Sequence, residues 1–427
     1  MKEIKIGILG FGTVGAGVVE GIINNGELIA QRTGIFPKIG KIADLDITSD
    51  RGVKVDPSML TTDALAVIDD PEIDVIVEMI GGTKLAKEFV LRALKNGKPV
   101  VTANKALLAE AGRELFEAAV ASGAGLYFEA SVGGGIPVLR ALRDGLVGNK
   151  IKSIYGILNG TCNYILTRME RESLDFDVVL ADAQKLGYAE TPPDLDIDAI
   201  DTAHKAVVLA SLAYGAPVAM DAFTIEGIRG LSHREIEYAG ELGYRIKLLA
   251  VIRETHGEVE MRVEPSLVPH GHLLASVHDA FNAVFIEGDV VGSTLYYGRG
   301  AGRLPTASAV IGDIIEAASG KADGSAWLLR NKTLPVRGAN DISIRCYLRL
   351  SLKDQPDVIA KVAHVLGKNL ISIASIIQKE KNAGEQVPVV ILTHKAPEKN
   401  FAAAMEEIEQ LDCVDGKPVR MAIEDFE

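Results

Sequence analysis

The chain reads KIGILGFGTVGAGVV over residues 5–19. An apolar strand pattern ends at Leu9, and Gly10, Gly12 and Gly15 follow with GxGxxG spacing before a helix pattern begins. Glycines at this spacing allow a tight turn and let backbone N–H groups at the helix N-terminus approach a pyrophosphate. Because the motif stands between a strand and a helix, it favours a dinucleotide-binding unit over an ordinary tight turn.

Short β-branched runs alternate with helical patterns up to about residue 130. The runs cover residues 39–43, 75–78, 100–102 and 126–128, and a helix pattern covers 105–122. Such alternation predicts parallel strands joined by helical crossovers. We therefore predict an α/β fold for residues 1–135, with the doubly wound parallel sheet of a Rossmann NAD(P)-binding domain.

The remainder of the chain has a different pattern. Residues 136–330 mix strands with helices and predict a second, α+β domain. Residues 331–344 contain Pro335, Gly338 and Asn340 and indicate a linker. Residues 345–427 predict a third unit with the order βαββαβ.

Composition excludes several classes of protein. The chain has 427 residues, 48% of them hydrophobic, and a net charge of −13, which is typical of a soluble globular protein and unfavourable for nucleic-acid binding. No apolar run reaches the length of ~18 residues that a membrane span needs, and no signal peptide pattern is present. Three scattered cysteines indicate reduced thiols in the cytoplasm.

The choice between NAD and NADP depends on the residues after the second strand. An acidic residue is expected about 20 residues after the glycines, but Asn24 to Pro37 have the pattern of an inserted segment. Asp44 and Asp46 end the second strand, and Arg51 follows. An Asp here favours NAD and an Arg favours NADP, so the sequence leaves both open.

Two segments carry candidate catalytic groups. Lys105 starts a helix at the carboxyl end of a strand, where open α/β sheets bind ligands. Farther along, Glu190 and Asp194 lie in a proline-containing loop, and Asp201 and Lys205 are spaced to share one face of the next helix. A lysine held by a carboxylate can exchange a proton with a substrate. The alternatives are a solvated helix start and a surface ion pair.

Glycine-rich turns occur at 129–137 and 298–309. In the first, consecutive glycines permit inward-pointing carbonyl groups, which together with Glu129 suit a hard cation. A flexible hinge between domains is an equally good explanation of this turn.

Six blocks in a fixed order together resemble the homoserine dehydrogenases of the monofunctional type that carry an ACT domain. The blocks are GFGTVG at 10–15, NKALLA at 104–109, EASVGGGIP at 129–137, LNGTCNYI at 158–165, GYAE with the later Asp and Lys at 187–205, and GRGAGRLPTASAV at 298–310. The resemblance extends over essentially the whole chain. It implies that residues 136–330 form the homoserine-binding, catalytic and dimerisation domain, and that the helix at 306–320 packs back on the first domain.

The resemblance implies roles for individual residues. Lys205 would exchange the proton of the substrate hydroxyl with help from Lys105, Glu190 would bind the homoserine amino group, and Asp196 and Asp201 would shape the pocket. The cofactor would be bound by Gly10, Phe11, Gly12, Thr13, Val14, Gly15, Arg51, Thr83, Lys105 and Gly302. A sodium ion would be bound, mostly through backbone carbonyls, by Glu129, Val132, Gly134 and Ile136.

The implied reaction is the reversible oxidation of L-homoserine to L-aspartate 4-semialdehyde with NADP or NAD, in threonine, methionine and isoleucine biosynthesis. The family favours a homodimer or homotetramer. The alternatives are an ACT-bearing dehydrogenase of prephenate or phosphoglycerate, which the block at 187–205 argues against, and a non-catalytic ligand sensor.

The sequence departs from the family at three places. Thr191-Pro192-Pro193 replaces the usual Pro-Asp-Pro after Glu190, Ala199 replaces a glycine, and Asp357 replaces the glycine that usually follows Pro356 in the C-terminal unit. The resemblance of that unit to an ACT domain implies that Asp354 caps its first helix and that threonine binds where two such domains pair. The alternative is a module that only dimerises.

Overall fold

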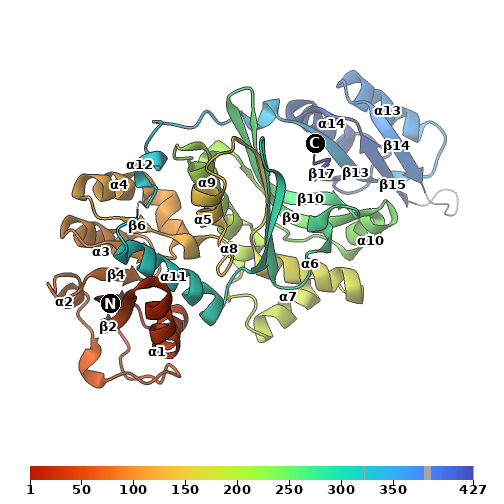
Figure 1. The fold of residues 1–427 in the computed structure, drawn as a ribbon. Helices are drawn as coiled ribbons and strands as arrows, with labels where there is room; N and C mark the ends of the chain where they lie inside the picture. The colour runs from red at the N-terminus through yellow and green to blue at the C-terminus, as the bar shows by residue number, and fades with distance from the viewer. Residues whose placement is uncertain (322, 379–385, 427) are drawn as a thin grey trace.

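The computed structural model describes residues 1–321, 323–378 and 386–426. Two sheets organise the chain, and the C-terminal unit lies at the end farthest from the N-terminal sheet (Figure 1). No helix in these residues is long and apolar enough to span a membrane.

The N-terminal sheet has the strand order β3-β2-β1-β4-β5-β6, and every pair in it is parallel. Its strands are β1 (Lys2–Leu9), β2 (Ile35–Ala43), β3 (Leu60–Thr61), β4 (Val75–Glu78), β5 (Val100–Thr102) and β6 (Leu126–Tyr127), and its crossover helices are α1 (Thr13–Thr33), α2 (Leu65–Ile68), α3 (Lys84–Lys95) and α4 (Lys105–Ser122). The predicted parallel α/β sheet is therefore confirmed. The strand order reverses between β1 and β4, which is where such sheets bind ligands.

The predicted insertion at Asn24 to Pro37 is wrong. Residues 24–33 continue α1, which ends at Gly34, and β2 begins at Ile35. Ile22, Gly26 and Ala30 are buried at a spacing of four residues, so packing against the sheet keeps this segment helical although Asn and Gly are weak helix formers.

Helix α11 (Arg303–Ala318) completes the core of the first domain although it comes late in the chain. Its buried residues Val310 and Ile314 belong to the same hydrophobic cluster as Ile6 and Val18. At Gly17 a side chain would meet the Arg303 carbonyl oxygen at 2.7 Å, so the small residue lets α1 approach α11 closely.

The second sheet contains the strands of both later parts of the chain. Along its main path the order is β12-β11-β7-β9-β10-β17-β13-β15-β14, with β8 added beside β10 and β16 beside β13. The strands are β7 (Ile151–Ile157), β8 (Thr224–Ile225), β9 (Tyr244–Thr255), β10 (Glu258–Pro269), β11 (Phe281–Gly288), β12 (Gly292–Arg299), β13 (Ser343–Lys353), β14 (Ile373–Gln378), β15 (Gln386–Thr393), β16 (Ala396–Pro397) and β17 (Val419–Ile423).

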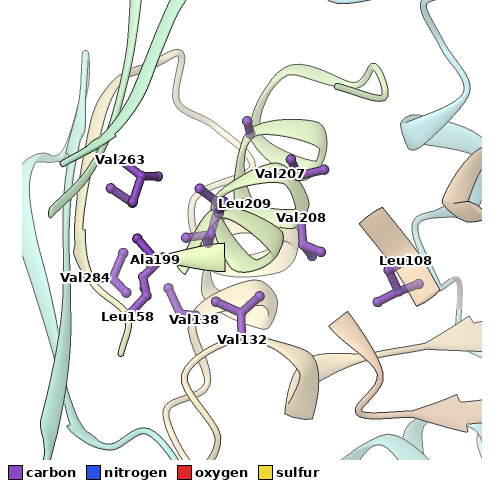
Figure 2. Packing of buried hydrophobic residues seen from close by; sticks show 14 of the residues in the cluster. Leu108, Val132, Val138, Leu158, Ala199, Val207, Val208, Leu209, Val263 and Val284 are labelled. Atoms are coloured by element: carbon purple, nitrogen blue, oxygen red, sulfur yellow. The ribbon is translucent and has the colours of Figure 1, made fainter. Parts of the chain in front are cut away.

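Helices between these strands pack on the sheet and on one another. They are α5 (Val138–Arg140), α6 (Gly160–Glu172), α7 (Phe176–Lys185), α8 (Asp194–Ile197), α9 (Ile200–Tyr214), α10 (His233–Glu241) and α12 (Ser325–Leu328). Figure 2 shows Val208 of α9 between Val263 on the sheet side and Leu108 of α4. Helix α9 is thus held from both sides, which gives it a fixed position between the domains.

The C-terminal unit follows the predicted element order but is joined to the second sheet. Helices α13 (Val358–Lys368) and α14 (Glu398–Glu409) lie between its strands. Strand β17 runs parallel to β10, with Ala422 beside Ser266, so the sheet is continuous between the two parts. The predicted linker is also anchored, since the Val259 amide donates to the Pro335 carbonyl at 2.8 Å.

The expected cap of the first helix in this unit is wrong. Asp357, not Asp354, precedes α13, and its φ of 75° is in the left-handed region. Asp354 accepts a hydrogen bond from Nε2 of Gln378 instead. Thus Asp357 adopts the conformation that a glycine usually supplies, and the turn is kept without the glycine.

Candidate active site

A cleft separates the strand ends of the first domain from α8 and α9. Its larger lobe has a volume of about 660 Å³ and its smaller lobe about 340 Å³. Both lobes are lined by Val14, Ala103, Lys105, Glu190, Asp196 and Asp201, while Lys205 and Gly302 line the larger one. The structure therefore brings residues from all the predicted catalytic segments together in one place.

The carboxylate of Asp201 lies between two lysines from different domains. Its Oδ2 is 2.6 Å from Nζ of Lys205, and its Oδ1 is 3.1 Å from Nζ of Lys105. Burial tends to raise the pKa of Asp201, but the two ammonium groups outweigh burial and lower it well below the usual range. The Asp201 side chain is thus ionised, and it links α4 to α9 across the cleft.

Lys205 is held at its ammonium group by two acceptors. Besides Asp201, the backbone carbonyl of Leu158 accepts from Nζ at 2.7 Å. The lysine side chain is 10% exposed, whereas that of Lys105 is 39% exposed. Lys205 is therefore the better oriented of the two, and it still lines the cleft that a substrate would enter.

Asn159 is a site residue that sequence reasoning did not identify. Its Nδ2 donates to Oδ1 of Asp196 at 2.7 Å and to Oδ2 of Asp201 at 3.0 Å, while its Oδ1 caps α6 by accepting from the Cys162 amide at 2.8 Å. An Asn before a helix is a recognisable N-cap. Its sequence position does not indicate that the same side chain orients two carboxylates.

The two carboxylates of the proline-containing loop lie in different surroundings. Asp196 is largely buried, and this burial raises its pKa above the usual range, helped by the nearby Asp201 charge. Glu190 lines both lobes and is exposed. Asp194, the other carboxylate predicted in this loop, lines neither lobe and pairs with Arg229. The loop thus presents Glu190 and Asp196 to the cleft.

The glycine-rich turn has the form expected for a phosphate-binding loop. A side chain at Gly15 would meet the Gly10 carbonyl oxygen at 2.1 Å, and one at Gly10, with φ of 99°, would meet the Met79 backbone at 2.6 Å. Gly12 precedes α1 without any side-chain cap, and no atom lies within 4 Å of where its side chain would be. The helix N-terminus is therefore open to an anion, and the loop fits the pyrophosphate of a dinucleotide.

Comparison with known proteins agrees with this geometry. Residues 10–129 match the family described as "Homoserine dehydrogenase, NAD binding domain", and residues 137–315 match "Homoserine dehydrogenase". A homoserine dehydrogenase of Neisseria gonorrhoeae is 44% identical over 99% of this chain and 98% of its own length. The chain belongs to the homoserine dehydrogenase family.

Solved homoserine dehydrogenases share this fold over all or most of the chain. One from Thiobacillus denitrificans has a TM-score of 0.93 at 42% identity and covers 100% of this chain and 99% of its own. A hyperthermophilic archaeal homoserine dehydrogenase in complex with NADPH is 28% identical over 74% of this chain and 98% of its own, with a TM-score of 0.62. The predicted family is confirmed, and so is the prediction that the chain is an NAD(P)-dependent oxidoreductase.

Two acidic residues and one arginine meet after the second strand, where dinucleotide-binding Rossmann folds place the adenosine ribose. Asp44 accepts a hydrogen bond from the backbone amide of Phe11. Nη2 of Arg51 is 3.1 Å from Oδ2 of Asp46 and 3.8 Å from Oδ1 of Asp44. Asp44 thus reaches the glycine loop without an insertion, and Arg51 lies beside it, so both candidates for cofactor choice remain at one site.

The strand ends next to the cleft carry a further network that sequence reasoning missed. Buried Glu78 accepts from Oγ1 of Thr102 at 2.6 Å, and burial raises its pKa above the usual range. Asn104 caps α4 and donates to the Gly82 carbonyl at 2.7 Å. Thr83 is the residue before α3, just beyond the lining residue Gly82.

The expected cation site of this homoserine dehydrogenase family member lies in the loop before α5. The carboxylate of Glu129 accepts from the amides of Leu139 and Arg140, at 2.9 and 2.7 Å, so it faces α5. Gly134, with φ of 54°, lines the larger lobe. The described residues contain no group of three His, Cys, Asp or Glu side chains suited to a metal ion.

Ala199 is the family departure that lies closest to the catalytic groups. It is fully buried, it precedes α9, and its φ of 65° is the left-handed conformation that a glycine adopts without cost. The backbone therefore keeps the turn that directs Asp201 and Lys205 into the cleft. We expect a cost of about 1 kcal/mol, which the surrounding packing offsets.

Proposed function

We propose that this chain catalyses the reversible, NAD(P)-dependent oxidation of L-homoserine to L-aspartate 4-semialdehyde. The observation that carries the proposal is the Asp201 carboxylate between Lys105 and Lys205, opposite an uncapped glycine-rich loop. A proton-exchanging group and a dinucleotide site thus face one another across a single cleft.

The nicotinamide cofactor, when bound, exchanges the hydride with C4 of the substrate. Gly10 to Gly15 would bind its pyrophosphate at the N-terminus of α1, and Val14, Lys105 and Gly302 line the cleft on the path toward α9. The phosphate-binding loop before α1 and Lys205 on α9 therefore lie on different elements, and α4, which packs against α9, joins the two sides of the cleft.

Lys205 moves the proton. In the reductive direction its ammonium group donates a proton to the developing alkoxide oxygen, and in the oxidative direction the neutral amine accepts the hydroxyl proton. Asp201 and the Leu158 carbonyl orient Nζ. Lys105 adds a second positive charge beside the oxygen on which negative charge develops.

Glu190 and Asp196 recognise the amino-acid end of the substrate. Glu190 is free to pair with the homoserine ammonium, because none of its carboxylate oxygens forms an ion pair with a described residue. Asp196 is held by Asn159 at the floor of the same lobe. Both carboxylates would attract a cationic group and repel a substrate with an added phosphate.

Two cofactor assignments complete the active site. Arg51 would contact the 2′-phosphate of NADP, and Asp44 would contact the ribose hydroxyls of NAD, so both cofactors are candidates.

A sodium ion would be bound by the backbone carbonyls of the loop that contains Glu129, Val132, Gly134 and Ile136. Carbonyl oxygens suit a hard cation, and stimulation of activity by sodium relative to choline would test it.

The C-terminal unit is the regulatory part of the proposal. We propose that residues 345–426 form an ACT domain that pairs with a second copy in a homodimer or homotetramer, and that threonine binds there as a feedback inhibitor. We place the reaction in the cytoplasm, in threonine, methionine and isoleucine biosynthesis.

A spectrophotometric assay of the full-length chain tests the central proposal. L-Homoserine is offered with NAD and with NADP, and the formation of the reduced cofactor is followed at neutral to alkaline pH. Reduction of either cofactor supports the proposal. Absence of reduction with both, by protein that binds them in a fluorescence titration, contradicts it.

A further inference from the structure

A separate cavity lies inside one chain, where the substrate-binding part meets the C-terminal unit. It has a volume of about 300 Å³. Its walls come from β8 and β10 on one side and from β13, α14 and β17 on the other, and they include Ile225, Arg262, Glu264, Ile344, Glu398 and Arg420. None of these residues belongs to the catalytic cleft.

One wall of the cavity is a fixed ion-pair network. Arg262 is 4% exposed and donates to Glu264 at 2.6 Å and to Glu260 at 3.3 Å, and it also donates to Glu424. All three of its guanidinium nitrogens are therefore used within the protein. This wall is rigid and offers little to a ligand beyond its shape.

Arg420 and Glu226 are the charged groups that remain available. Within the described part of the chain, Arg420 uses only Nη1 in its hydrogen bonds, chiefly to Glu398 at 2.6 Å, so the rest of its guanidinium can bind a carboxylate. Glu226 lines the cavity, and no cation of a described residue lies within 4.0 Å of its carboxylate.

The balance of charge and apolar surface selects a class of ligand. Two guanidinium groups face three carboxylates here, which disfavours a phosphate or a dicarboxylate. Ile225, Ile342 and Ile344 supply an apolar side. We propose that this cavity binds a free α-amino acid with a short aliphatic side chain, its carboxylate on Arg420 and its ammonium group on Glu226.

The cavity is connected to the active site by a short segment of backbone. Residues 224–226 form its β8 wall, and Gly227 and Ile228 follow directly. The Ile228 amide donates to the Ile197 carbonyl at 2.8 Å, and a side chain at Gly227 would lie 2.0 Å from the same oxygen. Ile197 ends α8, which contains Asp196, so a ligand that shifts β8 also shifts the substrate-binding loop.

This inference goes beyond the proposed function, and it differs from a threonine site between paired ACT domains because one chain supplies the whole cavity. Calorimetric titration of the full-length chain without homoserine or cofactor tests it, so its outcome does not depend on turnover. The probes are L-valine, L-isoleucine and L-threonine, with isobutylamine and 3-methylbutanoate as analogues of valine that lack one charge. The inference is supported if an L-amino acid binds about tenfold or more tightly than either analogue. No heat with any amino acid at millimolar concentration, or equal binding of the analogues, overturns it.

Three variants locate the bound molecule. Glu226→Gln and Arg420→Gln should each weaken binding about tenfold or more, and Glu226→Gln keeps the test valid if the other variant does not fold. Arg345→Gln is the matched control, because Arg345 pairs with Asp425 at 2.6 Å outside the cavity and its side chain is 24% exposed, as is that of Arg420. Unchanged affinity in Glu226→Gln, or an equal loss in Arg345→Gln, overturns the site. A homoserine KM that the bound amino acid leaves unchanged overturns the connection through Gly227.

Discussion

Nζ of Lys205 lies 2.6 Å from Oδ2 of Asp201, one turn earlier on the same helix. The pair faces a cleft rather than the solvent, and the two side chains are only 10% and 12% exposed. An ion pair at this helical spacing usually contributes little when it is on the surface. Here it orients the group that we propose to carry the proton.

Replacing Lys205 tests that role directly. Lys205→Ala should lower kcat for homoserine oxidation by about 10²- to 10⁴-fold, because it removes the proton-exchanging group. Lys185→Ala, at a side chain that is 76% exposed on α7, is the control and should retain turnover. An unchanged kcat in a folded Lys205→Ala enzyme would exclude the assigned role.

Glu190 is expected to act on substrate binding. Glu190→Gln keeps the shape of the side chain and removes its charge, so the KM for homoserine should rise about 10- to 100-fold while kcat changes much less. Steady-state kinetics at saturating cofactor measure the two constants separately. A fall in kcat at constant KM would place Glu190 in the chemical step instead.

Arg51 is expected to distinguish the two cofactors. If its guanidinium contacts the 2′-phosphate, Arg51→Ala should raise the KM for NADPH about 10- to 100-fold and leave that for NADH within about twofold. Parallel titrations of the two reduced cofactors with aspartate 4-semialdehyde measure this. Equal effects on the two KM values would show that Arg51 supports the structure of the loop that also contains Asp46.

Asp313 should make stability depend on pH. Burial and the neighbouring Glu129 carboxylate raise the pKa of Asp313 to about 8, against the opposing effect of Arg140. The folded state keeps a proton that the unfolded chain releases near its ordinary pKa of about 4. The free energy of unfolding therefore falls as the pH rises from about 4 to about 8.

Asp313→Asn removes this titration. Between about pH 5 and pH 8, the free energy of unfolding should decrease less in the variant than in the wild type, by ~1 kcal/mol or more. Urea denaturation at several pH values measures this difference. Asp341→Asn, at a side chain that is 66% exposed, serves as the control and should retain the wild-type slope. If the free energy of unfolding of Asp313→Asn falls with pH as steeply as that of the wild type, groups other than Asp313 cause the decrease.

Gly227 tests how closely α8 is held. Gly227→Ala places a methyl group against the Ile197 carbonyl oxygen, so α8 must move and the KM for homoserine should rise about tenfold. Gly240→Ala on α10, where the added group meets no atom within 4 Å, is the control. Wild-type kinetics in Gly227→Ala would mean that the contact relaxes without displacing Asp196.

The local features of the chain followed from the sequence alone. The glycine spacing at residues 10–15, the alternation of strands and helices, the bounds of α4 and the shared face of Asp201 and Lys205 were all predictable, because they depend on periodicity and backbone conformation within a few residues. The helical character of residues 24–33 was not predictable, since burial of Gly26 and Ala30 against the sheet outweighs the weak helix preference of Asn24, Asn25 and Gly26.

The tertiary structure alone decided which distant groups meet. Lys105 and Asp201 are far apart in the sequence and come within 3.1 Å only because α4 packs against α9. The packing of α6 and α8 beside α9 makes Asn159 a bridge between Asp196 and Asp201. Burial and the neighbouring charges then set the direction in which the pKa of each carboxyl group is shifted. Local pattern specifies the face on which a side chain lies, whereas its partners and its dielectric surroundings are specified by how the elements pack.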